Sequence, residues 1–104
     1  MKNLVVYYQL KQNESYDIAV ENIESVINNL KAKYIIKGVF VDSFENQSEL
    51  FELLQKPLSE IDYILMESEP ADEFTWQLLN ELSRTENFEV KYLRSVFQSV
   101  ENSK

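Results

Sequence analysis

Cysteine and histidine are both missing from this chain of 104 residues. Without cysteine the protein has no disulfide framework, no zinc–thiolate site and no thiol nucleophile. Without histidine it lacks the commonest general base and the commonest ligand of transition metals. The composition therefore favours a protein that does no chemistry of its own and carries no cofactor.

Glycine and arginine are also scarce. Gly38 is the only glycine, which excludes the glycine-rich phosphate-binding loops of nucleotide-binding proteins. Arginine occurs only at Arg84 and Arg94, and 10 basic against 18 acidic residues give a formal net charge of −8. Because nucleic-acid binding rests on Lys and Arg contacts to phosphate, we expect no direct binding to DNA and no attraction to anionic membranes.

Long apolar runs are absent as well. No segment approaches the roughly 20 apolar residues of a membrane span, and the apolar run near the start is too short for the core of a signal peptide. The sequence therefore predicts a cytoplasmic protein without membrane contact.

The residues that are present suit a single globular domain. The chain is 44% hydrophobic, 12% aromatic and 27% charged, which is ordinary for a folded protein of this size. We expect one domain over residues 1–94 and a short C-terminal helical turn or tail over residues 95–104.

Strand-like and helix-like segments alternate along the domain. Short β-branched and aromatic runs predict strands over residues 4–10, 34–42, 61–66 and 88–93. Helical spacing predicts a helix over 16–33, a short helix from 46 that Pro57 ends, and a third helix that begins near Pro70 and Asp72. The expected inner faces include Tyr16 in the first helix and Phe74 in the third.

The order β-α-β-α-β-α-β predicts an α/β fold. Its strands should pair in parallel through right-handed crossovers, in a three-layer, doubly wound sheet of order 2-1-3-4. A site in such a sheet lies beyond the carboxyl ends of the strands. Residues 9–15, 42–46 and 67–72, and those from 94 onward, should form that edge.

Several segments carry a resemblance to a known family: VVYY at 5–8, GVFVD at 38–42, LFELL at 50–54, IDYIL at 61–65 and QLLNEL at 77–82. In order and spacing they resemble the N-terminal catalytic domain of the serine recombinases, the resolvase/invertase family. The resemblance implies a resolvase-like or flavodoxin-like sheet. It also implies a link to phage or other mobile-element proteins.

The catalytic groups of that family are not matched. The family ends its first strand with Tyr-x-Arg-x-Ser, and the positions matching its arginine and its nucleophilic serine are Gln9 and Lys11. After the third strand, an acidic segment at 67–73 stands where the family has Leu-Asp-Arg-x-x-Arg. Since no arginine precedes Arg84, these loops cannot assemble a cationic cradle for a phosphate in its transition state. The resemblance therefore implies a pseudoenzyme.

Acidic side chains gather at the predicted edge instead, namely Asp42, Glu67, Glu69 and Asp72. Carboxylates in such a place are the ligands of Mg²⁺ and Ca²⁺, so a metal-binding or metal-dependent module is the alternative function. The other interpretation is a solvated loop beside a favourably charged helix N-terminus.

Three aromatic side chains are candidates for an interface: Trp76, Tyr8 and Phe97. Trp76 is off the apolar stripe of the third helix, and tryptophan and tyrosine are enriched in protein–protein contacts. Each of the three is equally compatible with packing inside a three-layer fold. The function that the sequence favours is non-enzymatic, by contact with a protein partner or a second copy of the chain.

Overall fold

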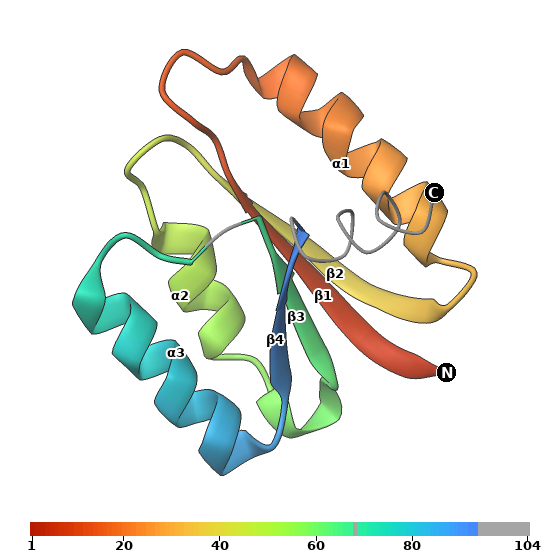
Figure 1. Ribbon diagram of the computed structural model, residues 1–104, viewed down its shortest axis with the longest axis vertical. Coiled ribbons are helices and arrows are strands. Elements are labelled where there is room, and N and C mark those ends of the chain that lie inside the picture. Colours follow the sequence, from red (N-terminus) through yellow and green to blue (C-terminus); the bar gives the residue numbers. More distant parts are fainter. Residues whose placement is uncertain (68, 94–104) are drawn as a thin grey trace, which may run out of the picture.

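The computed structural model describes residues 1–67 and 69–93 and confirms the predicted α/β architecture (Figure 1). All strand pairs are parallel, and the sheet has the order β2-β1-β3-β4. The strands are β1 (Lys2–Gln9), β2 (Tyr34–Asp42), β3 (Tyr63–Met66) and β4 (Glu89–Tyr92). The helices are α1 (Tyr16–Leu30), α2 (Ser48–Leu54) and α3 (Glu73–Glu86), with a 3₁₀ turn at Leu58–Glu60. The predicted tail over 95–104, with Phe97, lies outside the described residues.

Strand β1 is the centre of the fold, because both of its faces are buried. Leu4, Val6 and Tyr8 pack into the cluster beneath α1, whereas Val5 and Tyr7 pack into the cluster beneath α2 and α3. Figure 1 shows α1 on one side of the sheet and the other two helices on the opposite side. A strand covered on both faces has no polar face, which explains the uninterrupted apolar run in the sequence.

Two residues of the predicted inner faces are exposed instead. Tyr16 is 60% and Phe74 is 67% exposed, so both predictions are wrong. In α3 the buried positions are Thr75 and Leu79, one turn apart. The hydroxyl of Thr75 donates to Asp72 Oδ2 at 2.6 Å, and this contact helps to hold the helix with Thr75 inward. Phe74, one residue away, is then turned by about 100° from the core.

The ends of two helices are set by local side chains. Ser15 Oγ accepts a hydrogen bond from the Ile18 N–H at 3.2 Å and caps α1. Asp72 Oδ2 accepts from the Thr75 N–H at 2.9 Å and caps α3. These caps satisfy backbone donors that have no partner within the helix.

Helix α2 is capped by a residue from another element. The sequence suggests a capping box at Asn46 and Glu49, but Asn46 Oδ1 accepts only from the Ser48 N–H, at 2.9 Å. The N–H groups of Glu49 and Leu50 donate to the carboxylate of Asp42, at 2.9 and 3.1 Å. Asp42 is the last residue of β2, so the end of the strand caps the helix that follows it.

The same carboxylate is joined to the central strand. Asp42 is only 2% exposed, and its Oδ2 accepts a hydrogen bond from the Tyr7 hydroxyl at 2.6 Å. Burial, followed by the hydrogen bond and the negative charge of Asp42, raises the pKa of Tyr7 far above its usual value, so the hydroxyl remains a donor. One carboxylate therefore connects β1, β2 and α2.

Removal of this carboxylate should be costly. We expect Asp42→Ala to lower the free energy of unfolding by about 3 kcal/mol, because buried donors lose a charged acceptor. Tyr7→Phe should cost about 1 kcal/mol, because Asp42 keeps its helix partners. Urea unfolding at pH 7 measures both, with Asp17→Ala in the exposed first turn of α1 as the control. Equal stability of Asp42→Ala and the wild type would contradict this account.

Candidate functional site

A cleft of about 600 Å³ lies at the carboxyl ends of the strands, at the edge that the sequence indicates. The loops after β1, β2 and β3 and the start of α3 form its walls. The residues of interest that line it are Gln9, Lys11, Phe44, Glu67, Glu69 and Asp72. The structure thus brings together most of the predicted edge, but Asp42 is not among the lining residues.

Two similar turns shape the mouth of the cleft. One is closed by the Glu14 N–H donating to the Lys11 carbonyl at 3.1 Å, and the other by Asn46 donating to Ser43 at 3.0 Å. The third residue of each turn is left-handed, Asn13 with φ 69° and Glu45 with φ 64°. Asparagine tolerates this conformation well, whereas for glutamate it is uncommon.

Gln9 holds two of these loops together. Its Nε2 donates to the Asn46 carbonyl at 2.7 Å, so the end of β1 is joined to the loop that follows β2. A structural amide therefore occupies the position at which the resemblance to the recombinases would expect a catalytic arginine. A neutral side chain bonded to the backbone offers no charge to a phosphate.

Lys11, at the position matching the nucleophilic serine, forms an ion pair. Its Nζ is 2.6 Å from Glu67 Oε1, and the two side chains are 65% and 26% exposed. Such a pair adds little to stability because solvent screens it. The pair matters more for the chemistry of the cleft. The positive charge of Lys11 is already paired with a carboxylate that lines the same cleft.

Tyr8, an interface candidate, is buried and does not offer a surface anchor. It is 4% exposed in the cluster beneath α1, and its hydroxyl donates to Glu14 Oε2 at 2.5 Å. Burial is the largest cause that raises the pKa of Tyr8, followed by the Glu14 contact. Both neighbouring tyrosines are buried because β1 is covered on both faces, so neither points outward.

The four carboxylates do not assemble a metal site. In residues 1–67 and 69–93, no three acidic side chains come together in a group that could hold a metal ion. Asp42 is bound to Tyr7 and to the N-terminus of α2, and Glu67 is paired with Lys11. Asp72 is occupied as the cap of α3, where hydrogen bonds from the Thr75 hydroxyl and N–H lower its pKa. Three of the four carboxylates therefore have partners within the protein, and the metal-binding module stays an alternative hypothesis.

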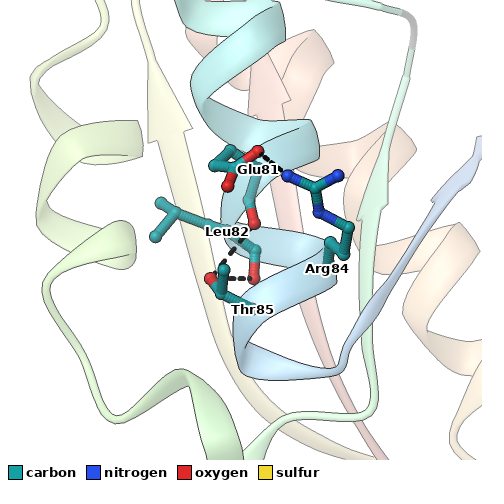
Figure 2. A network of polar contacts seen from close by, with 4 residues as sticks. All are labelled: Glu81, Leu82, Arg84 and Thr85. Atoms are coloured by element: carbon teal, nitrogen blue, oxygen red, sulfur yellow. Dashed lines mark hydrogen bonds and ion pairs between the residues drawn. The ribbon is translucent and has the colours of Figure 1, made fainter.

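The arginine of the described chain lies on α3, away from the cleft-lining residues. Figure 2 shows Arg84 in the last turn of the helix, with its guanidinium bound to the Glu81 carboxylate. Beside it, the Thr85 hydroxyl is 3.1 Å from the Glu81 carbonyl and 3.4 Å from that of Leu82. Both charged groups are exposed, and their contact lowers the pKa of Glu81 and raises that of Arg84.

Trp76 is on a different flank of α3, facing β4. It is 39% exposed and lines an open groove together with Tyr92. Burial, followed by the charge of Glu69, raises the pKa of Tyr92, and a hydrogen bond from Trp76 partly opposes this shift. The sequence identified Trp76 as off the apolar stripe, but its pairing with an edge strand became visible only in the fold.

Comparison with protein-family models and with curated proteins gives no match for this chain. None of the helices in the described ranges is long and apolar enough to cross a membrane.

We expect divalent cations to leave the protein unchanged. Because three of the four candidate carboxylates are engaged by the protein itself, Mg²⁺ or Mn²⁺ should produce no saturable rise in the melting temperature. A thermal-shift titration measures this, with Glu67→Gln as the control for cation binding at the cleft. A saturable stabilisation that Glu67→Gln abolishes would restore the metal site.

The contact of Glu14 with Tyr8 should make stability depend on pH. Burial raises the pKa of Glu14, but the Tyr8 hydroxyl, the Lys11 N–H and the Lys11 charge together outweigh it, and the net shift is downward. A lowered pKa stabilises the fold above the ordinary carboxyl value, about 4.3, and the gain disappears as the pH falls through the folded value.

We therefore expect Glu14→Gln to be less stable than the wild type at pH 7, with a smaller difference at pH 3. Urea unfolding at both pH values measures the effect, and Glu24→Gln on the exposed face of α1 is the control. A difference that stays constant between the two pH values would refute the role of the Glu14 charge.

Proposed function

We propose that this protein is a non-enzymatic domain that acts through protein–protein contact. The observation that carries the proposal is the state of the cleft at the strand ends. The cation among its lining residues, Lys11, is neutralised by Glu67, and Gln9 is bonded to the backbone. A site that transfers a phosphoryl or acyl group needs preorganised donors free to meet developing negative charge.

The buried polar groups support the same interpretation. In the part of the chain that the structure describes, no buried side-chain nitrogen or oxygen lacks a hydrogen-bond partner. A catalytic role is one of the reasons why a native structure leaves such a group unsatisfied. Here the polar groups beneath the cleft serve the fold.

The surface offers aromatic side chains for contact with a partner. Phe74 is 67%, Phe44 is 46% and Trp76 is 39% exposed. Large aromatic side chains contribute most of the energy of many interfaces when they become buried. The resemblance to the serine recombinases suggests which proteins to test: a second copy, a recombinase, or another protein of a phage or mobile element.

The first test concerns catalysis on DNA. We expect the purified chain to leave supercoiled DNA intact and to form no covalent protein–DNA adduct, because no free cation faces the cleft among its described lining residues. Gel electrophoresis with and without denaturant measures both products. Strand cleavage or an adduct that depends on Lys11 would overturn the proposal.

The second test concerns contact with protein. The immobilised chain should retain specific proteins from the lysate of its own cell, and Trp76→Ala should lose them because the exposed indole is the expected anchor. Tyr16→Ala, which removes an aromatic ring from α1 on the other side of the sheet, is the matched control. Recovery of the same proteins by both variants would exclude Trp76 as the anchor.

A further inference from the structure

We propose that edge strand β4 pairs in antiparallel fashion with β4 of a second copy, forming a two-fold symmetric dimer with one continuous sheet. The inference rests on the proposed function, since it names a second copy of the chain as the partner. It is carried by three features of the β4 edge: backbone groups that no other strand of residues 1–67 and 69–93 binds, the order of its charges, and the groove beside α3.

The first feature is the direction of the backbone groups. The Glu89 N–H donates to the Asp62 carbonyl at 2.9 Å, so the polar backbone groups of Glu89 face β3. The register of β4 on β3 has no irregularity, and backbone groups alternate in direction along a strand. Those of Val90 and Tyr92 therefore point away from β3, to the edge that no other described strand occupies, and an added strand centred on Val90 would bind those of Val90.

The second feature is the charge pattern. Strand β4 reads Glu-Val-Lys-Tyr, and Glu89 and Lys91 project from the same face, with their charged atoms 3.6 Å apart. In an antiparallel pair centred on Val90, each Glu89 is directly opposite Lys91 of the second copy. Two opposite-charge pairs then form on one face, and Val90 meets its counterpart on the other. The strand is self-complementary in this register.

The third feature is the groove beside the strand. It has a volume of about 650 Å³, and one stripe of α3 lines it, formed by Trp76, Asn80, Ser83 and Asn87. A two-fold axis perpendicular to the sheet keeps both α3 helices on the same face. The two stripes would then flank each other across the new strand pair, and Trp76 would be covered. An isologous contact of this kind closes as a dimer.

The opposite edge of the sheet is not suited to the same pairing. Strand β2 has an irregular register opposite Leu4 and Val5, where Lys37 has no partner in β1. An antiparallel pair centred there would put Lys37 opposite its own copy, and bulges and lysines are the usual means by which edges avoid pairing. Because β2 is not suited to this pairing, we place the dimer contact at β4.

The test is a set of charge reversals on the full chain, measured by sedimentation equilibrium up to about 1 mM protein. We expect the wild type to dimerise. Lys91→Glu puts carboxylates opposite carboxylates, and Glu89→Lys puts ammonium groups opposite ammonium groups. Each variant alone should therefore dimerise at least about tenfold more weakly. An equimolar mixture of the two variants restores the opposite-charge pairs and should form a heterodimer. Lys37→Glu, the same charge change on β2, is the matched control and should dimerise like the wild type.

A wild type that is monomeric throughout this range, or a dimer that Lys91→Glu leaves intact, would overturn the proposal. Circular dichroism checks the fold of each variant, and recovery in the mixture cannot come from misfolded chains. Failure here is distinguishable from failure of the proposed function. If the chain is monomeric but still retains another protein through Trp76, only the dimer proposal is refuted. If the chain cleaves DNA, the proposed non-enzymatic function is refuted.

Discussion

The buried carboxylate of Asp42 is the contact on which the arrangement of the other elements depends. It accepts from the Tyr7 hydroxyl of β1 at 2.6 Å and from two N–H groups at the start of α2, at 2.9 and 3.1 Å. An ionised group taken out of water needs such a set of donors, because otherwise its desolvation would not be offset. These hydrogen bonds join the central strand, the edge strand and the helix that follows it. Tyr7 and Leu50, which both donate to this carboxylate, also line the cleft.

Three polar side chains around the cleft are engaged by another part of the chain. Gln9 binds the loop after β2, Lys11 pairs with Glu67, and Asp72 caps α3. The location is one where α/β proteins commonly bind ligands, but the side chains there hold loops in place. In this protein the described arginine is on α3, paired with Glu81.

The two edges of the sheet differ in how well each is protected from pairing with another strand. Strand β2 is long but carries a register irregularity and Lys37, whereas β4 is short, regular and flanked by the polar stripe of α3. Unpaired backbone groups at an edge attract other strands, so each edge needs a means of control. On β4 the charges of Glu89 and Lys91 determine which strand can pair with the edge. Opposite-charge pairs form only with a strand whose charges run in the reverse order.

The sequence by itself determined the elements, the parallel sheet and its order, because the apolar periods and the alternation of strand and helix are local patterns. The caps at Ser15 and Asp72 are local as well, since each side chain binds an N–H three residues further along. Only the tertiary structure decided the burial of Tyr8 and the exposure of Phe74. It also decided the role of Asp42, whose hydrogen-bond partner Tyr7 is 35 residues away. The physical reason is that a side chain's burial and charge partners depend on which distant element covers it. Rotating a helix by one residue changes which of its side chains are buried. Covering a strand on both faces buries side chains that would otherwise face solvent. Neither change alters the local sequence pattern.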